Sequence, residues 1–193
     1  QQAKDSPVAT YYAAKAEFYL SEFVFEEYTK TSMSGTSAKK QGEQLIKKTK
    51  SLIEVQKLYE NIIGTYRQAD WSLAALFRIG GLYDNLQTTI FDAPCPKDVA
   101  AIDDIACEEY GYMLEDRAVT IEDKAVEAYR TANEKALELN VKNEWQQKTL
   151  EALNRLRSDD FPMDNKPLES PISGNVYAQG FLRIDGGAPF LKT

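Results

Sequence analysis

The chain has 193 residues, of which 23 are Lys or Arg and 30 are Asp or Glu, giving a net charge of −7. It contains two cysteines and no histidine, which excludes Ser-His-Asp and Cys-His relays, histidine zinc ligands and a closed four-ligand zinc site. The acidic balance disfavours nucleic acid and anionic membranes as partners, and no apolar run approaches the ~18 residues of a membrane span. The 43% hydrophobic content suits one folded domain or a short repeat array.

Helix-favouring residues dominate two long stretches in which glycine and proline are sparse. They predict five helices, over residues 7–30, 39–63, 71–89, 108–139 and 144–157. Residues with capping chemistry mark the expected ends: Ser6 with Pro7, Gly64, Asp70, Asn140, and Asn143 with Gln146. We therefore expect an all-α domain over residues 1–162.

Two segments depart from this helical texture. The first, residues 91–107, holds two prolines and both cysteines and is predicted to be an irregular insertion. The second, residues 163–193, is rich in proline and glycine and is predicted to be an extended tail that needs a partner surface to become ordered. Because the chain starts at Gln1 rather than Met, we expect a processed N-terminus.

An internal pattern links the third and fourth predicted helices. One carries large and small residues at Leu76, Ile79, Gly80 and Tyr83, and the other carries Ala125, Tyr129 and Ala132. These resemble the two halves of a tetratricopeptide (TPR) repeat, W-x2-L-G-x2-Y and A-x3-F-x2-A. The resemblance implies stacked antiparallel helical hairpins over roughly residues 8–157. The units are longer than the usual ~34 residues, so we expect long helices and enlarged loops.

A second resemblance rests on whole stretches of sequence. Residues 15–28, 71–83 and 124–129, with Asn143-Glu-Trp145 and 153–157, look like the closing portion of large TPR proteins of Gram-negative envelopes, including gliding-motility types. It implies a periplasmic, envelope or secreted scaffold for protein–protein contacts rather than an enzyme. In such an oxidising compartment Cys95 and Cys107 would form a disulfide. The alternative is two unrelated thiols.

Charge and aromatic residues are unevenly distributed. Residues 98–127 hold ten acids against two basic residues, and residues 39–57 hold six lysines against two glutamates. The acids lack the order of a calcium-binding loop, which favours a solvated acidic face over a metal site.

In the first helix, aromatic and small residues at 12, 16, 19 and 23 share one face, and those at 11, 18 and 25 share another. We expect burial of these faces, with a docking surface for another chain as the alternative.

The leading functional hypothesis is a non-catalytic scaffold that binds other proteins or peptides without a cofactor. No nucleotide-binding or nucleophile motif is present in the sequence. Candidate groove residues on the inner helices are Arg78, Tyr83, Asn85 and Gln146, and the alternative is that they are ordinary solvated or core positions. The tail or another copy of the chain could supply the bound segment. Two further hypotheses are a structural subunit of a filament or large complex, and a ligand-binding protein or enzyme that uses carboxylates.

Overall fold

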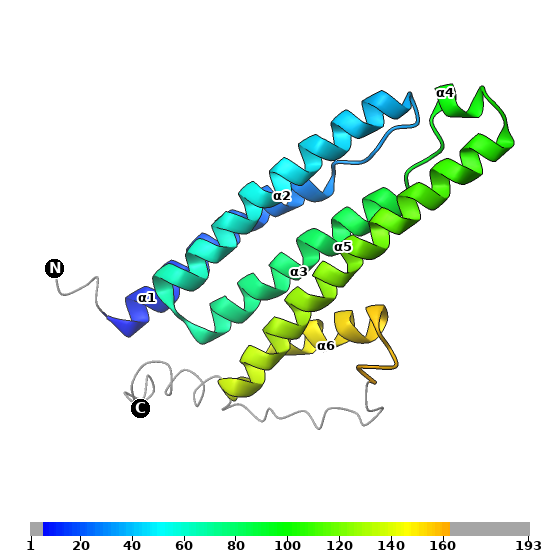
Figure 1. The fold of residues 1–193 in the computed structure, drawn as a ribbon. Coiled ribbons are helices and arrows are strands. Elements are labelled where there is room, and N and C mark those ends of the chain that lie inside the picture. The colour runs from blue at the N-terminus through cyan, green and yellow to red at the C-terminus, as the bar shows by residue number, and fades with distance from the viewer. Residues whose placement is uncertain (1–5, 163–193) are drawn as a thin grey trace.

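The computed structural model describes residues 6–162, and every regular element in that range is an α-helix (Figure 1). The helices are α1 (Pro7–Thr29), α2 (Ala38–Tyr66), α3 (Ala69–Phe91), α4 (Lys97–Ala100), α5 (Asp104–Glu138) and α6 (Glu144–Leu156). The described part of the chain is therefore all-helical, as predicted, and the short α4 has no counterpart among the predicted helices. The predicted tail, residues 163–193, lies outside the described residues.

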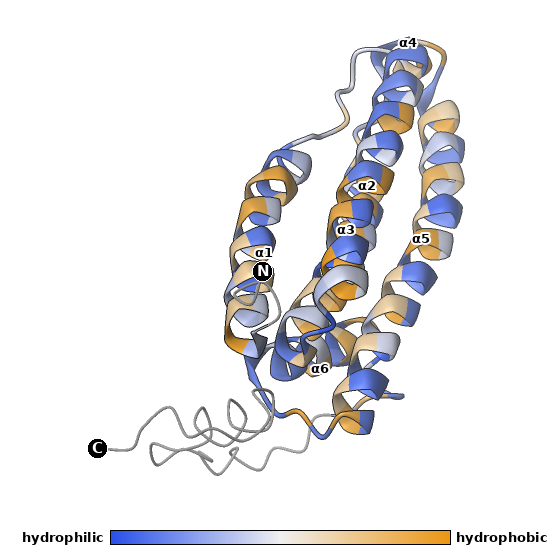
Figure 2. Cartoon of the chain, turned by 90° about the vertical axis from the view of Figure 1, so that its left-hand side faces the viewer, coloured by the Kyte–Doolittle hydropathy of each residue, from blue (hydrophilic) through white to orange (hydrophobic). Residues whose placement is uncertain are grey.

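The central element of the fold is α3. It contacts α1, α2, α5 and α6, and Figure 2 shows it between α1 and α5, with α6 at the lower end. The helices α1 and α2 run side by side in opposite directions, as do α3 and α5 (Figure 1). With neighbours on several sides, α3 buries small and large residues alike, and Leu73, Ala74, Ala75 and Leu82 are at most 2% exposed.

Several helix ends lie where capping chemistry places them. Ser6 and Pro7 mark the start of α1 as predicted, although the Ser6 side chain makes no capping hydrogen bond. The Asn143 side chain accepts hydrogen bonds from the backbone N–H groups of Trp145 and Gln146 at the start of α6. Asn140, just after α5, has a φ of 50°, in the left-handed region that asparagine tolerates. These local signals were sufficient because a cap depends on its nearest neighbours in sequence.

Two predicted caps are wrong. The helix α2 continues through Gly64 to Tyr66 and ends at Arg67, which itself takes a left-handed φ of 52°. The extra turn carries Tyr66, whose hydroxyl donates to Glu17 of α1. Asp70 lies inside the first turn of α3, where its carboxylate accepts a hydrogen bond from the Asn143 side chain. In both cases the helix boundary differs from the predicted one next to a residue that contacts a distant part of the chain.

Cys95 and Cys107 form a disulfide, with their Cα atoms 5.6 Å apart. The helix α5 begins four residues earlier than predicted, because the Asp103 side chain accepts a hydrogen bond from the Ala106 N–H. Cys107 thus lies in the first turns of α5. The same region is hydrogen-bonded to the connection between α1 and α2. Lys97 donates its backbone N–H to the Gly35 carbonyl, and the Asp98 carboxylate accepts from the Ala38 N–H at the start of α2.

One lysine of the basic segment is buried. Lys48 is 1% exposed, and its ammonium donates to the backbone carbonyls of Tyr28 (3.3 Å) and Thr31 (2.6 Å) at the end of α1. It also lies 4.5 Å from the centre of the Tyr28 ring. Burial lowers the pKa of Lys48 to about 8. Lys48 therefore gives a second donor to the Tyr28 carbonyl, which also accepts the Thr31 N–H, and a donor to the Thr31 carbonyl just beyond α1.

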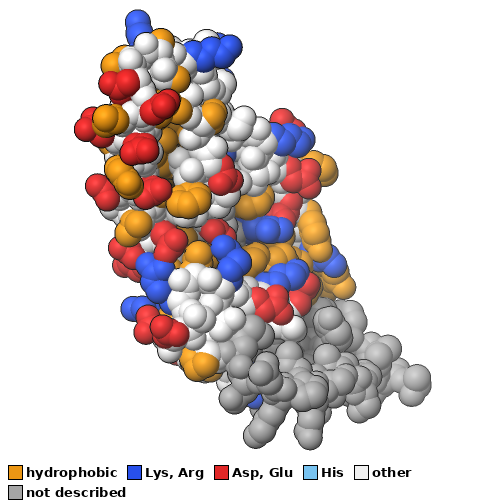
Figure 3. All heavy atoms as spheres, turned by 90° about the vertical axis from the view of Figure 1, so that its right-hand side faces the viewer, with side chains coloured by type: hydrophobic (Ala, Val, Ile, Leu, Met, Phe, Trp, Pro, Cys, Tyr) orange, Lys and Arg blue, Asp and Glu red, His pale blue; other side chains and the backbone are white. Residues whose placement is uncertain are grey.

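The acidic segment forms an exposed face, as predicted. Of the acids between residues 98 and 127, only Glu122 is partly buried, where it pairs with Arg157. Figure 3 shows acidic and hydrophobic side chains alternating along one edge of the molecule. Among the described residues no helix is long and apolar enough to cross a membrane, and no group of three or more metal-ligating side chains is suited to hold a metal ion.

The aromatic residues of α1 divide between its two faces. Phe18 is fully buried among the rings of Tyr59, Trp71 and Trp145, at centroid distances of 5.2 to 5.8 Å. On the other face, the side chains of Tyr12, Tyr19 and Phe23 are more than half exposed. The expectation of burial therefore holds for the face with residues 11, 18 and 25 and fails for the face with residues 12, 16, 19 and 23.

Candidate functional site

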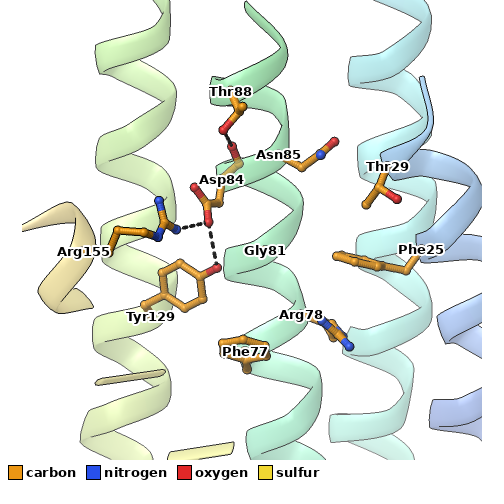
Figure 4. A pocket seen from close by; sticks show the side chains of 10 residues that line it. All are labelled: Phe25, Thr29, Phe77, Arg78, Gly81, Asp84, Asn85, Thr88, Tyr129 and Arg155. Atoms are coloured by element: carbon orange, nitrogen blue, oxygen red, sulfur yellow. Dashed lines mark hydrogen bonds and ion pairs between the residues drawn. The ribbon is translucent and has the colours of Figure 1, made fainter. Parts of the chain in front are cut away.

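A hollow of about 400 Å³ lies against α3, between α1 on one side and α5 and α6 on the other (Figure 4). Its lining comes from four helices: Phe25 and Thr29 of α1; Phe77, Arg78, Gly81, Asp84, Asn85 and Thr88 of α3; Tyr129 of α5; and Arg155 of α6. The lining residues of α3 recur at spacings of three and four, so they share one face of the helix. We call this hollow the α3 groove.

Arg78 at one end of the groove is held by an ion pair and by aromatic rings. Its Nε donates to both carboxylate oxygens of Glu22 at 2.9 Å, and its Nη2 donates to one of them. The guanidinium lies 4.8 Å from the centre of the Phe25 ring and 5.7 Å from that of Trp145. Arg78 thus joins α1, α3 and α6, and its charge is compensated.

The Glu22 carboxylate has a second partner. The hydroxyl of Tyr59, on α2, donates to it at 2.7 Å. The pKa of Tyr59 is raised, first by burial and then by this hydrogen bond and the negative charge of Glu22. Glu22 consequently connects α1 to both α2 and α3, which holds the wall of the groove in place.

The opposite wall contains a second compensated pair. Arg155 forms an ion pair with Asp84, and the Tyr129 hydroxyl donates to the same carboxylate oxygen at 3.3 Å. The Arg155 side chain is 56% exposed and that of Asp84 is 18% exposed. Burial, followed by the charge of Asp84, raises the pKa of Tyr129. The groove therefore offers two cation–anion pairs and no excess of charge.

Asn85 is the polar residue of the groove with unused hydrogen-bonding capacity. Its amide oxygen is buried and has no hydrogen-bond partner among residues 6–162. Figure 4 shows the side chain projecting from α3 towards the side on which Thr29 lies. A buried carbonyl oxygen without a donor carries a free-energy cost of about 1 to 3 kcal/mol. A ligand N–H group at this point would remove that cost.

The four predicted groove residues occupy three different places. Arg78 and Asn85 line the α3 groove. Tyr83 lies in a separate hollow between α2, α3 and α5, where its hydroxyl donates to the Gln56 side chain at 2.9 Å. Gln146 is in the first turn of α6, donates its N–H to Asn143, and lines neither hollow. Tyr83 lies on a different face of α3 from Arg78, because five residues correspond to a rotation of about 140° around the helix.

Sequence reasoning missed most of the groove lining. Gly81, Asp84 and Thr88 could have been found, because they follow Arg78 at intervals of three or four residues on the same helix face. Tyr129 and Arg155 could not be placed there, because they lie 45 and 71 residues from Asp84. Only the packing of α5 and α6 against α3 brings them to the groove.

Comparison with known proteins identifies no relative: no protein-family model, curated protein or solved structure matches this chain.

Proposed function

We propose that the chain is a non-catalytic, TPR-like scaffold that binds an extended peptide segment of another protein in the α3 groove. The packing order of the helices supports the repeat: α1 pairs with α2, α3 pairs with α5, and α1, α3 and α6 are in contact in series. The close contact of Gly80 with Tyr129 also supports it, since the TPR pattern has a small and an aromatic residue at these two positions.

The unpartnered oxygen of Asn85 is the observation that carries the peptide proposal. An extended peptide presents backbone N–H groups that are free to donate, and Asn85, whose side chain lines the groove, carries a buried acceptor without a partner. Aromatic rings of Phe25, Phe77 and Tyr129 provide apolar contact area beside it. The two arginines are already paired with Glu22 and Asp84. We therefore expect the peptide to supply backbone groups and apolar side chains rather than a charged terminus.

An envelope or extracellular location is part of the same proposal. A disulfide between Cys95 and Cys107 persists in oxidising compartments and is rare in the cytosol. Candidate sources of the peptide are another protein, another copy of the chain, and residues 163–193. Of these we propose another protein, because the bound segment then joins two different proteins, as a scaffold requires.

The experiment selects binding peptides from a displayed random library with the full chain and measures their affinity by fluorescence anisotropy. Thr88→Trp places an indole over the groove and is expected to weaken binding at least tenfold. The matched control is Thr131→Trp, because Thr131 is also an exposed helical threonine whose hydroxyl donates to the carbonyl four residues earlier, but it lies in the other hollow. Equal affinities for the two variants would contradict binding in the α3 groove.

A further inference from the structure

The N-terminal half of α5 carries an apolar stripe that nothing covers in the described part of the chain. Ile105, Tyr112 and Val119 follow one another at seven-residue spacing, which places them on one face of the helix, and they are 65%, 64% and 57% exposed. The next member of the line, Val126, is only 6% exposed because α6 packs over it through Leu153. We call the first three residues the α5 stripe.

The α5 stripe is exposed because α6 is much shorter than α5. The helix α6 has 13 residues and α5 has 35, so α6 covers α5 only towards its C-terminal end (Figure 1). The exposed acids Glu108, Glu115 and Asp116 lie beside the stripe, and Arg117 is the only basic residue from 104 to 119. The stripe is thus an apolar line with acidic borders.

A complementary stripe lies on α2. Ile46 and Ile53, again seven residues apart, are 58% and 48% exposed. Lys39, Lys50 and Lys57 are exposed on the same helix face. No ion pair engages these lysines within residues 6–162. We call Ile46 and Ile53 the α2 stripe; three exposed lysines border it, together with the exposed Glu43 and Glu60, so its borders are mainly basic where those of the α5 stripe are acidic.

We infer that the α2 stripe of one copy packs against the α5 stripe of a second copy. Two helices with apolar residues at seven-residue spacing can interlock side by side, and flanking charges of opposite sign align them. Within one copy the residues of both stripes remain about half exposed or more, so the two stripes do not cover each other. Because the contact joins two different surfaces, it either closes into a ring or continues as a chain of molecules.

Sedimentation velocity of the full chain over a range of concentrations tests this inference. The mean mass is expected to rise with concentration and to fall again at 1 M salt, because lysine–glutamate attraction is screened there. Lys50→Glu with Lys57→Glu should weaken association at least tenfold, and so should Glu108→Lys with Glu115→Lys. An equimolar mixture of the two double variants should associate again, because the unaltered stripe of each variant matches the unaltered stripe of the other, and the two reversed stripes match each other.

The control changes charge elsewhere. Glu134→Lys with Asp159→Lys alters two exposed acids away from both stripes and changes the net charge as Glu108→Lys with Glu115→Lys does, and association should be unchanged. Circular dichroism checks that each variant is folded, which is expected because every substituted side chain is exposed. A wild-type chain that stays monomeric at all concentrations would overturn the inference. So would association that neither stripe variant weakens, or a mixture that does not associate.

Discussion

Gly80 of α3 lies directly against the ring of Tyr129 of α5: a Cβ atom at position 80 would be 2.5 Å from two ring carbons. Non-bonded carbon atoms prefer separations of about 3.5 to 4.0 Å. The absent side chain at position 80 therefore allows α3 and α5 to approach, and Tyr129 fills the space beside it. This contact fixes the position of Tyr129, which lines the α3 groove.

Gly80→Ala is expected to destabilise the fold by about 1 to 3 kcal/mol, because Tyr129 is buried and must move to admit the methyl group. The measurement is the free energy of unfolding in urea. Gly64→Ala is the control, since Gly64 lies within α2 and a Cβ there meets nothing within 4 Å. The control should gain about 0.5 to 1 kcal/mol from helix propensity. Equal effects of the two substitutions would contradict the close contact.

Arg78→Ala is expected to destabilise the fold by about 1 to 3 kcal/mol. It removes a bidentate ion pair and leaves the Glu22 carboxylate, which is 18% exposed, with only the Tyr59 hydroxyl. A double-mutant cycle with Glu22→Gln should give a coupling energy of at least ~1 kcal/mol. The same cycle for Arg155 and Asp84 is the comparison, and it should give less, because the Arg155 side chain is more than half exposed. A larger coupling for the second pair would contradict this ranking.

The pH dependence of stability tests the burial of Lys48. Burial lowers its pKa to about 8 in the folded chain, whereas an unfolded lysine has a pKa near ~10.4. Between these values the unfolded chain binds more protons, so the contribution of Lys48 to stability increases as pH rises from about 8 to 10. Relative to Lys48→Met, the wild-type free energy of unfolding should rise by on the order of 1 kcal/mol over that window.

The comparison with Lys48→Met is necessary because buried tyrosines respond in the opposite direction. The pKa of Tyr28, Tyr59 and Tyr129 is raised by burial, so unfolding becomes easier once unfolded tyrosines ionise above pH ~10. Those tyrosines are present in both proteins and cancel in the difference. A difference that is flat from pH 7 to 10 would show that Lys48 titrates normally and is therefore accessible to water.

Reduction of the disulfide should lower the free energy of unfolding by on the order of 3 kcal/mol, the value for a loop of about this size in the chain-entropy treatment. Cys95 and Cys107 are 12 residues apart in sequence. The measurement is thermal unfolding with and without reductant, and a chain with both cysteines replaced by serine serves as the insensitive control. Mass spectrometry without reductant that finds two free thiols in protein isolated from its native cells would contradict the pairing.

The sequence was informative wherever structure depends on near neighbours. The cap at Asn143 and the apolar face of α1 through Phe18 follow from patterns within a few residues. It failed where a distant contact decides. Glu22 and Arg78 are 56 residues apart, so sequence patterns could not show that Arg78 is held in an ion pair; its role in peptide binding stays a prediction. Tyr83 faces a different hollow, because a shared helix does not mean a shared face.

The central claim is that the α3 groove binds an extended peptide, and chemical-shift mapping by NMR tests it most directly. The isotope-labelled full chain is titrated with a peptide selected from the library. We predict that backbone signals of residues 25–29 and 77–88 shift together, and that the side-chain amide signals of Asn85 shift most, as its oxygen gains a donor. Shifts confined to the hollow around Tyr83, or saturating binding that leaves Asn85 unchanged, would contradict the account.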